Sequence, residues 1–467
     1  MTFKPLLSVL AMTLAGCSLT PDYRRPEAPI PQAYPQGGAY AAPAPQRAAL
    51  NDGQALFNSP ALQQLLGLAL ENNRDLRKAL LNVAAYRAQY RIQGSALLPD
   101  IAIDGAAARA RTPADLSSTG DQVTGADNSL QIGLTRYELD VWGRIRSLDR
   151  SALQTYLASE ETQRSVRIGL VAEVAVAYLT WQTDQQLLAV TRSTLANYQH
   201  NLQLIQSSNA AGTASDLDVR QARTLVFSAQ GQVQAYTRQV AQDANGLRLL
   251  LGTNIPARLP VADLDARTLT PIPAGLPADL LRQRPDIRAA EHQLLAADAN
   301  IGAARAAFFP SITLTAGAGT ASSQLNGLFD SGSQSWSFIP QIHLPIFTGG
   351  RLGASLDYAK IQQEIGVVNY EQVIQSAFRE VADGLAAMGT WDAQLKSQQD
   401  LVRASDEYTR MALQRYDEGV DNYLTLLDAQ RQLLSARQKL LSDQLAKWCA
   451  HIQLYKALGG GWTEKRA

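Results

Sequence analysis

One uninterrupted helical pattern constrains the fold of this sequence more than any other feature. From about Ser147 to Ala211, apolar residues such as Val174, Tyr178 and Leu188 recur at the spacings of three and four that mark one face of an α-helix. About 64 residues at a rise of ~1.5 Å each make a helix roughly 95 Å long. A helix of this length does not fit inside a compact globular domain, so the pattern predicts a coiled coil or a helical tube.

The long helix reverses and returns, and a second hairpin of the same kind follows later in the chain. Gly212 interrupts the hairpin at 147–251, and Gly419 interrupts the hairpin at 351–458. Glycine is expected there because helix ends need a positive φ. Asp421 or Asn422 is expected to cap the helix that returns after Gly419. The predicted helix-reversal turns therefore contain Gly212, Gly419, Asp421 and Asn422.

The returning helix of the second hairpin carries two different faces. One face is a packing stripe with an apolar residue every seven positions. Its members are Leu427, Leu434, Leu441, Trp448 and Tyr455. At roughly 100° per residue, Leu424, Asp428 and Arg431 fall on the opposite side of the same helix. A helix tip that packs on one side and presents a carboxylate and a guanidinium on the other is a candidate functional site.

The chain is internally duplicated. Asn73-Arg74-Asp75 returns as Arg284-Pro285-Asp286 at an offset of 286 − 75 = 211, and Gly212 returns as Gly419 at an offset of 419 − 212 = 207. Each copy reads as a short helix, a strand, a loop, a strand and a long helical hairpin. The first copy is expected at 61–252 and the second at 281–459, with a proline-rich linker at 253–280 and a tail at 460–467.

Two segments change from helical to alternating periodicity. The first copy predicts strands at about 101–109 and 129–142, joined by an exposed loop at 112–128. The second copy predicts strands at 312–323 and 336–347, with the loop 324–335 between them. The short helix before the first strand should begin at Pro60, capped by Asn58 or Ser59, and run to about Gln93.

Four strands per chain are too few to close a membrane barrel, for which about eight is the practical minimum. After the first residues, no stretch of 18 or more is apolar enough for a spanning helix, so strands would have to cross any membrane. Three chains would supply twelve strands. Aromatic residues near the strand ends would suit the girdle of such a barrel, the alternative being ordinary strand aromatics. They are Tyr137, Trp142, Trp336, Phe338 and Phe347.

The first residues read as an export signal. Lys4 provides a positive charge, residues 6–14 are apolar, and Leu14-Ala15-Gly16-Cys17 ends the run. This ending resembles the bacterial lipoprotein signal, which implies removal of the signal peptide 1–16, acylation of Cys17 and, because Ser18 follows, sorting to the outer membrane. Residues 17–60 would then be a lipidated tether. The alternative is an ordinary signal peptide with an incidental cysteine.

Composition argues against several function classes. Lys and Arg number 42 and Asp and Glu also number 42, a balance that argues against nucleic-acid binding. The four histidines are far apart, and Cys449 remains as an unpaired thiol, so no metal site or disulfide is expected. The run Gly459–Gly461 follows a helix and not a strand, unlike a phosphate-binding loop. We therefore expect no enzyme, and no cofactor besides a covalent lipid on Cys17.

Three strings together resemble the TolC-type outer-membrane factors, in particular the lipoprotein channels of multidrug efflux pumps. They are Gly419 to Gln430, Arg282 to Ile287 and Tyr455 to Trp462. The resemblance implies a mainly α-helical chain with a small β part. Three copies would form a twelve-stranded barrel in the outer membrane above a helical tube in the periplasm. It also implies a periplasmic membrane-fusion adaptor and an inner-membrane exporter of the resistance-nodulation-division type as partners.

The same resemblance assigns a periplasmic gate to Leu424, Asp428 and Arg431. Three Asp428 carboxylates would line a constriction that repels anions, pairing of Arg431 with acidic groups would hold the tips closed, and Leu424 would block the remaining opening. The first copy has Leu217, Gln221 and Thr224 at these places and so lacks the charge pair. The alternative for the charges is an ordinary solvated helix face.

Two other functions remain compatible with the sequence. One is a channel for secreted proteins, and the other is a periplasmic coiled-coil lipoprotein without a pore, which would have no need of the strands. The cluster Asp140, Arg144 and Arg146 near a predicted strand–helix junction has no assigned role.

Overall fold

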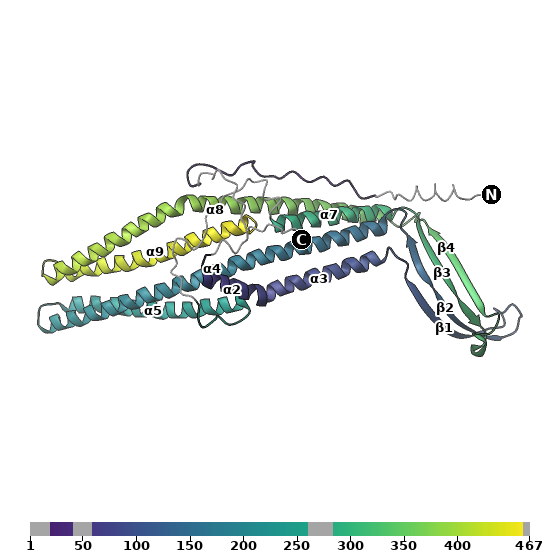
Figure 1. The fold of residues 1–467 in the computed structure, drawn as a ribbon, viewed down its shortest axis with the longest axis horizontal. Coiled ribbons are helices and arrows are strands. Elements are labelled where there is room, and N and C mark those ends of the chain that lie inside the picture. The colour runs from purple at the N-terminus through teal and green to yellow at the C-terminus, as the bar shows by residue number, and fades with distance from the viewer. Residues whose placement is uncertain (1–18, 41–57, 260–283, 461–467) are drawn as a thin grey trace. The chain divides into compact units, whose positions relative to one another are not determined.

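The structure, a computed structural model, describes residues 19–40, 58–259 and 284–460 (Figure 1). The predicted signal 1–16 and Cys17 lie outside these ranges, as do most of the linker and most of the tail. The described residues form two compact units. The first contains 19–27, 81–160 and 289–371, and the second contains 28–40, 58–80, 161–259, 284–288 and 372–460.

The first unit contains a four-stranded antiparallel sheet in the order β1-β2-β3-β4 (Figure 1). Its strands are β1 (Ile101–Thr112), β2 (Val123–Leu139), β3 (Ser311–Ser322) and β4 (Gln334–His343). The first strand pair extends further toward its loop than predicted, because the Thr112–Val123 pairing recruits polar residues that carry no apolar alternation. Strands β2 and β4 end earlier than predicted, because the pairing of β2 with β3 ends at Leu139 and the pairing of β3 with β4 ends at His343.

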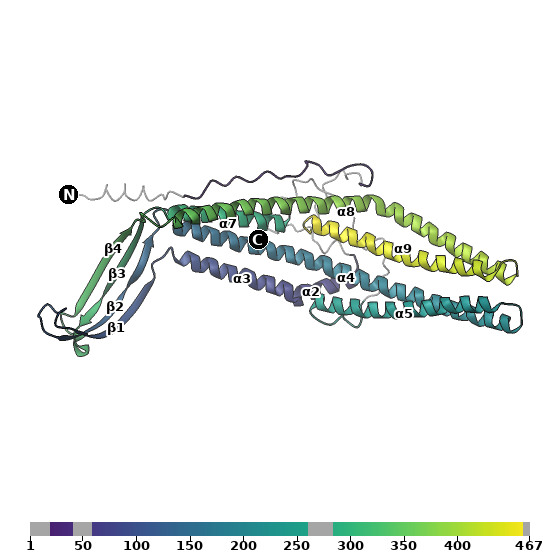
Figure 2. The same cartoon turned by 180° about the vertical axis from the view of Figure 1, so that it is seen from behind.

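Long helices form the two hairpins. They are α4 (Arg144–Ala210) with α5 (Asp216–Leu251), and α8 (Arg351–Asp417) with α9 (Tyr423–Ala457). In both views the helices of each hairpin lie side by side (Figures 1 and 2). Helices α4 and α8 have 67 residues each, which confirms the unbroken helical pattern. Among the described helices, none combines the length and apolar character that a membrane span requires.

Helix boundaries repeat with the offsets expected from the duplication. The starts of α4 and α8 differ by 351 − 144 = 207, and their ends differ by 417 − 210 = 207. The short helices α3 (Arg74–Ser95) and α7 (Pro285–Ala306) keep the other offset, since 285 − 74 and 306 − 95 both equal 211. The duplication is therefore confirmed at the level of secondary structure.

The first short helix is divided, which the sequence pattern did not predict. Helix α2 (Pro60–Asn72) begins at the cap Ser59, and the chain leaves helical geometry at Asn73, with φ −63° and ψ 133°, before α3 starts. Asn73 Oδ1 accepts a hydrogen bond from the backbone N–H of Leu76, and its Nδ2 donates to the Leu250 carbonyl oxygen at 2.8 Å. A contact with a residue 177 positions away stabilises this break, so local periodicity does not reveal it.

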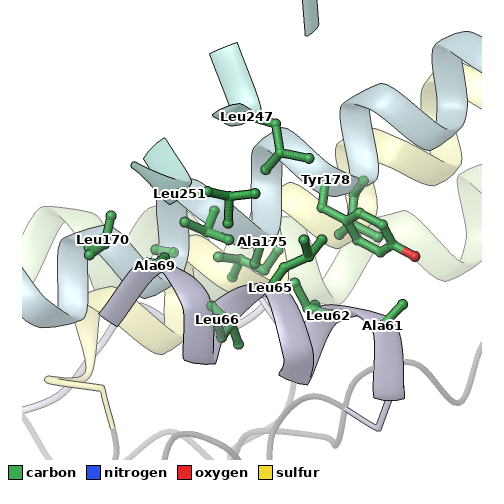
Figure 3. Packing of buried hydrophobic residues seen from close by; sticks show 14 of the residues in the cluster. Ala61, Leu62, Leu65, Leu66, Ala69, Leu170, Ala175, Tyr178, Leu247 and Leu251 are labelled. Carbon is green, nitrogen blue, oxygen red and sulfur yellow. The ribbon is translucent and has the colours of Figure 1, made fainter. Parts of the chain in front are cut away.

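A hydrophobic cluster in the second unit joins α2 to the long helices (Figure 3). Leu62 and Leu65 from α2 are fully buried against Tyr178 of α4 and Leu247 of α5. Trp448, Ile452 and Tyr455 of α9 belong to the same cluster. Burial of such side chains contributes about 1.5–3 kcal/mol each, so α2 is a structural part of the second unit.

The unassigned cluster near the strand–helix junction has a structural role. The Asp140 carboxylate accepts hydrogen bonds from the backbone N–H groups of Ile145 and Arg146, both at 2.9 Å, and so satisfies donors at the start of α4. Arg146 also pairs with Asp140, and Arg144 makes a bidentate pair with Glu138 at 2.6 and 2.8 Å. These contacts fix the chain where β2 passes into α4.

Candidate functional site

The sheet has one apolar face and one polar face. Residues that pair across antiparallel strands lie on the same face, so the register identifies rows that cross all four strands. One row is Ile103, Ile132, Ala318 and Trp336, and the next row on that face is Ile101, Leu134, Ala316 and Phe338. The intervening rows on the opposite face are Asp104, Gln131, Gly319 and Ser335, and Ala102, Gly133, Gly317 and Ser337.

Glycines on the polar face allow β2 and β3 to approach closely. A Cβ atom at Gly133 would lie 2.2 Å from the Ala316 carbonyl oxygen, and one at Gly319 would lie 2.1 Å from the Leu130 carbonyl oxygen. Neither position can accept a side chain without a backbone shift. The polar face is therefore lined by small groups next to Asp104 and Gln131.

The two outer strands each have one edge that pairs with nothing in the described chain, since β1 contacts only β2 and β4 contacts only β3. Three of the predicted girdle aromatics are largely exposed, namely Trp336 (81%), Phe338 (59%) and Phe347 (92%). The other two, Tyr137 and Trp142, are half-buried and make contacts within the unit. Trp142 stacks on Phe309 and donates from Nε1 to the Pro310 carbonyl oxygen, and the Tyr137 hydroxyl donates to the Leu97 carbonyl oxygen.

A second candidate site is the reversal between α8 and α9. Gly419 has φ 71°, as a helix-ending glycine requires, and Asn422 caps α9 by accepting from the Thr425 backbone N–H at 3.3 Å. Asp421 belongs to the turn but does not cap the helix. Its carboxylate makes a bidentate pair with Arg415, at 2.7 Å to Nε and 3.0 Å to Nη2, which lowers the pKa of Asp421.

The three predicted gate residues lie on the exposed side of the α9 tip. Leu424 is 49% exposed, and Asp428 and Arg431 are exposed as well. Neither charged side chain forms a salt bridge within the described residues of this chain. Their neighbours Leu426, Leu427 and Ala429 are almost fully buried, which confirms the separation into a packing face and a polar face.

A cluster of two buried tyrosines and one half-buried tyrosine lies behind this polar face. Tyr416 and Tyr423 meet edge to face at 5.6 Å, and Tyr198 of α4 joins the same cluster. Burial raises the pKa of Tyr198 and of Tyr423 to about 12, while the nearby Arg431 guanidinium lowers both values. The Tyr198 hydroxyl oxygen is buried with no hydrogen-bond partner in the described part of the chain. Arg431 therefore lies beside uncharged phenols, and among the described residues it forms no salt bridge with a carboxylate.

The tip between α4 and α5 has the same turn without the charges. Gly212 has φ 78°, and Ser215 forms a capping box with Asp218, whose backbone N–H donates to Ser215 Oγ at 3.2 Å. Leu217 is 64% exposed, in the position equivalent to Leu424. Gln221 and Thr224 replace Asp428 and Arg431. Only the second tip carries an exposed charge pair at these positions.

The sequence prediction missed two features of the second tip. Arg415 and Asp421 are six residues apart on either side of Gly419, and opposite charges flanking a predicted turn are a usable signal for such a pair. The tyrosine cluster joins residues of α4, α8 and α9, and only the packing of the two hairpins brings them together. Within the described ranges, no three His, Cys, Asp or Glu side chains gather where they could hold a metal.

Comparison with known proteins identifies related chains. The model of the family described as outer membrane efflux protein matches residues 65–253 and again 276–460. The chain is 57% identical over 460 residues to the toluene efflux pump outer membrane protein TtgF of Pseudomonas putida. That match covers 97% of this chain and 96% of the relative.

Two solved structures have the same fold. A membrane protein from Pseudomonas aeruginosa superposes with a TM-score of 0.89 at 41% identity, covering 95% of this chain and 100% of the other. The open state of the Neisseria gonorrhoeae MtrE outer membrane channel superposes with a TM-score of 0.85 at 38% identity, covering 95% and 98%. The duplicated family match and these two folds agree with the repeat found in the helix boundaries.

Proposed function

The chain belongs to the outer membrane efflux protein family, and from this premise we propose that it is the exit duct of a tripartite efflux pump, gated at its second helix tip. It is an outer-membrane channel that extends into the periplasm. Small compounds pass through it passively, and the energy for export comes from elsewhere in the pump. Three copies of the chain form the conducting unit.

The observation that best supports the channel function is the β-sheet, which has one apolar face, one polar face and an unpaired edge on each outer strand. In a bilayer every backbone N–H and C=O needs a partner, so a sheet with free edges must close on further strands. Three copies supply twelve strands, with the row of Ile103, Ile132 and Trp336 toward lipid and the row of Asp104 and Gln131 toward an aqueous lumen. A coiled-coil scaffold without a pore would not need this arrangement.

The gate is proposed at Leu424, Asp428 and Arg431. Three copies bring three Asp428 carboxylates to one constriction, where they attract cations and repel anions. Arg431 has no acidic partner in its own described chain, so an ion pair that holds the tips closed would form with an acidic group of another copy. Exposed pairs contribute only about 0–1 kcal/mol each, so a partner that binds the open tips better can open the gate.

The partners follow from the tripartite arrangement. A periplasmic membrane-fusion adaptor binds the helix tips, and an inner-membrane exporter of the resistance-nodulation-division type drives transport. The relative TtgF serves toluene efflux, and we extend this to small hydrophobic solvents and drugs as the substrate class. A lipid on Cys17 would anchor the chain to the outer membrane in addition to the barrel.

Deletion and complementation test the transport function. A strain without this channel and without related channels should become more susceptible to solvents and drugs, and the full-length gene should restore resistance. Unchanged susceptibility after deletion would contradict drug and solvent efflux. Accumulation of an exported protein inside the cell would favour the secretion alternative instead.

Conductance in planar bilayers tests the gate. Asp428→Ala should reduce the cation preference of the channel, because it removes three carboxylates from one ring. Gln221→Ala, at the equivalent place in the first tip, is the matched control and should leave ion selectivity unchanged. Identical conductance and selectivity for Asp428→Ala and the unmodified protein would exclude Asp428 from the constriction.

A further inference from the structure

Two arginines lie on the apolar face of the sheet, at the loop end of β1. Alternate residues of β1 share a face, so the face that contains Ile103 also contains Arg109 and Arg111. Both arginine side chains are exposed. Neither forms a salt bridge within the described chain, although Arg111 donates a hydrogen bond to the Gln122 side-chain oxygen. The two guanidinium groups therefore have no counter-ion among the described residues.

The acidic residues of the same strand pair lie on the opposite face. The β1–β2 ladder contains two carboxylates, Asp104 of β1 and Asp127 of β2, and Asp127 pairs with Ala108. These positions alternate with the arginine positions, so both carboxylates belong to the polar face. The two arginines instead pair with uncharged residues, Ala126 and Thr124. An ion pair across strands needs both signs on one face, so the arginines do not stabilise the sheet in that way.

The length of β1 places both arginines at the far edge of an apolar band. Helix α3 ends at Ser95 and β1 starts at Ile101, so the Ile101 end of the strand is the periplasmic end of the proposed barrel. Arg109 and Arg111 follow Ile101 by 109 − 101 = 8 and 111 − 101 = 10 residues. At ~3.4 Å per residue and a strand tilt of about 40°, they lie roughly 21 and 26 Å above it. The apolar band of a membrane barrel is about 25 Å tall.

This height decides whether an outward-facing arginine is tolerated. A guanidinium group at the bilayer midplane is strongly disfavoured, whereas the cost nearly vanishes at the interface. The three rows of the β1–β2 ladder nearer the midplane carry no charge on this face. They are Ile103–Ile132, Gly105–Leu130 and Ala107–Asn128. Charge on this face of the ladder thus begins only where the headgroups of the outer leaflet begin.

We propose that Arg109 and Arg111 bind the phosphates of lipopolysaccharide, the phosphorylated glycolipid of the outer leaflet. Guanidinium groups form short, bidentate, charge-assisted hydrogen bonds with phosphate oxygens, and basic clusters at a bilayer surface attract anionic headgroups. The inference rests on the proposed barrel and identifies the lipid around it. With the offset of 211 the second copy has Thr320 and Ser322 at these positions, so the site occurs once per chain and three times per trimer.

Titration with lipid A, the phosphorylated part of lipopolysaccharide, tests the site. Delipidated full-length trimers in detergent are titrated with lipid A and with the same lipid after its phosphates have been removed. The double variant Arg109→Gln/Arg111→Gln should bind lipid A roughly tenfold or more weakly than the unmodified trimer, because it loses the charge-assisted bonds. Its affinity for the dephosphorylated lipid should equal that of the unmodified trimer. Equal affinities of both proteins for lipid A would overturn the site.

A matched control keeps the charge and changes only the face. The variant Ala108→Arg/Arg109→Gln/Ala110→Arg/Arg111→Gln moves both guanidinium groups by one residue, at nearly the same height, onto the polar face. It should bind lipid A as weakly as the double glutamine variant. Binding as tight as that of the unmodified trimer would overturn the assignment to the outward face, since net charge alone would then explain the affinity.

Phosphatidylglycerol distinguishes the glycolipid from an ordinary phospholipid. Lipid A carries two phosphates and can engage both arginines, whereas phosphatidylglycerol carries one. Mixed micelles of phosphatidylglycerol should therefore bind the unmodified trimer several times more weakly than lipid A does, roughly in proportion to the lost contact. Equally tight binding of phosphatidylglycerol would overturn the choice of lipopolysaccharide as the ligand.

The outcome is separable from that of the channel function. A trimer that conducts in planar bilayers but binds lipid A without dependence on these arginines would overturn the site and leave the channel standing. A trimer that binds lipid A as expected and does not conduct would support the site and contradict the channel. If the double variant fails to assemble, Arg109→Gln and Arg111→Gln are measured singly. Each should lower the affinity about threefold, and no loss in either would overturn the site.

Discussion

Arg284 joins three helices of the second unit through one buried guanidinium. Its Nη1 donates to the Ala457 carbonyl oxygen at 2.8 Å and to Glu380 of α8 at 2.7 Å, and it pairs with Asp286 of α7. The first copy makes the equivalent contact with a shorter side chain, because Asn73 donates to the Leu250 carbonyl oxygen. The two carbonyls are related by the repeat offset, since 457 − 250 = 207, so both copies fix the end of the returning helix in the same way.

Removal of the Arg284 guanidinium should therefore be costly. Arg284→Met leaves the Ala457 carbonyl without its donor, and we expect the free energy of unfolding to fall by about 1–3 kcal/mol. Chemical denaturation of the full-length protein in detergent measures the change. Arg403→Ala, at a side chain that is 78% exposed, should change it by less than about 0.5 kcal/mol. Equal losses for both variants would contradict the structural role of Arg284.

A carboxyl pair between α4 and α5 should make stability depend on pH. Burial, and then the neighbouring Asp243 carboxyl, raise the pKa of Asp184 from 3.8 to about 7. Asp243 accepts from Gln239 at 2.9 Å through Oδ1, and its Oδ2 is buried without another partner among the described residues. The folded chain therefore holds a proton that the unfolded chain releases between pH 4 and pH 7. Stability should fall as the pH rises through this window.

Thermal unfolding at pH 5 and pH 8 tests this dependence. Asp184→Asn keeps an uncharged group at all pH values, so it should flatten the pH profile and raise the midpoint at pH 8. The exposed carboxylate Asp357 offers the control Asp357→Asn, which should keep the slope of the unmodified protein. A slope unchanged by Asp184→Asn would show that another group causes it.

At the scale of elements, the second helix reversal depends on the backbone conformation of Gly419. Its φ of 71° strains any L side chain by roughly 1–2 kcal/mol, although no atom lies within 4 Å of an added Cβ. Gly419→Ala should therefore destabilise the α8–α9 hairpin by about 1 kcal/mol. Gly353→Ala, inside α8 and also in open space, should stabilise by about 0.5–1 kcal/mol. Denaturation midpoints that shift in the same direction for both variants would contradict this assignment.

The elements that the sequence predicts best are those whose signals are local and repeated. Gly212 and Gly419 mark the reversals, and the offsets of 207 and 211 return in the helix boundaries. The break at Asn73 was missed because its partner, Leu250, is distant in sequence. The limits of β2 and β4 were wrong because ladder pairing, and not side-chain alternation, determines where a strand ends.

The candidate site shows the same division between local and distant causes. Periodicity along α9 separated Leu424, Asp428 and Arg431 from the packing face, and burial confirms that separation. The role of Asp421 was not predictable from a capping preference alone, since its carboxylate forms a salt bridge with Arg415 and does not cap the helix. The tyrosines beside Arg431 are Tyr198 of α4 and Tyr423 of α9, so their proximity depends on tertiary packing that no single segment encodes.

At the scale of the whole molecule, the two faces of the sheet should respond differently to the same charge. Gln131 and Ile132 are neighbours in β2, and their side chains point to opposite faces. Ile132 pairs with Ile103 and Ala318 on the apolar face, whereas Gln131 pairs with Asp104 and Gly319 on the polar face. If three copies close a barrel, only Ile132 faces lipid.

Lysine at each position therefore distinguishes a membrane wall from an ordinary sheet. Ile132→Lys should cost about 2–4 kcal/mol per chain near the bilayer midplane and reduce the trimer recovered from outer membranes. Gln131→Lys should assemble normally and shift ion selectivity toward anions, because it adds a positive charge near Asp104 in the lumen. Trimer yield and single-channel reversal potentials measure the two effects. The assignment of the two faces would be reversed if the Ile132→Lys trimer assembled normally and the Gln131→Lys trimer did not assemble. The reason is that a lysine without a partner is tolerated only where water reaches it.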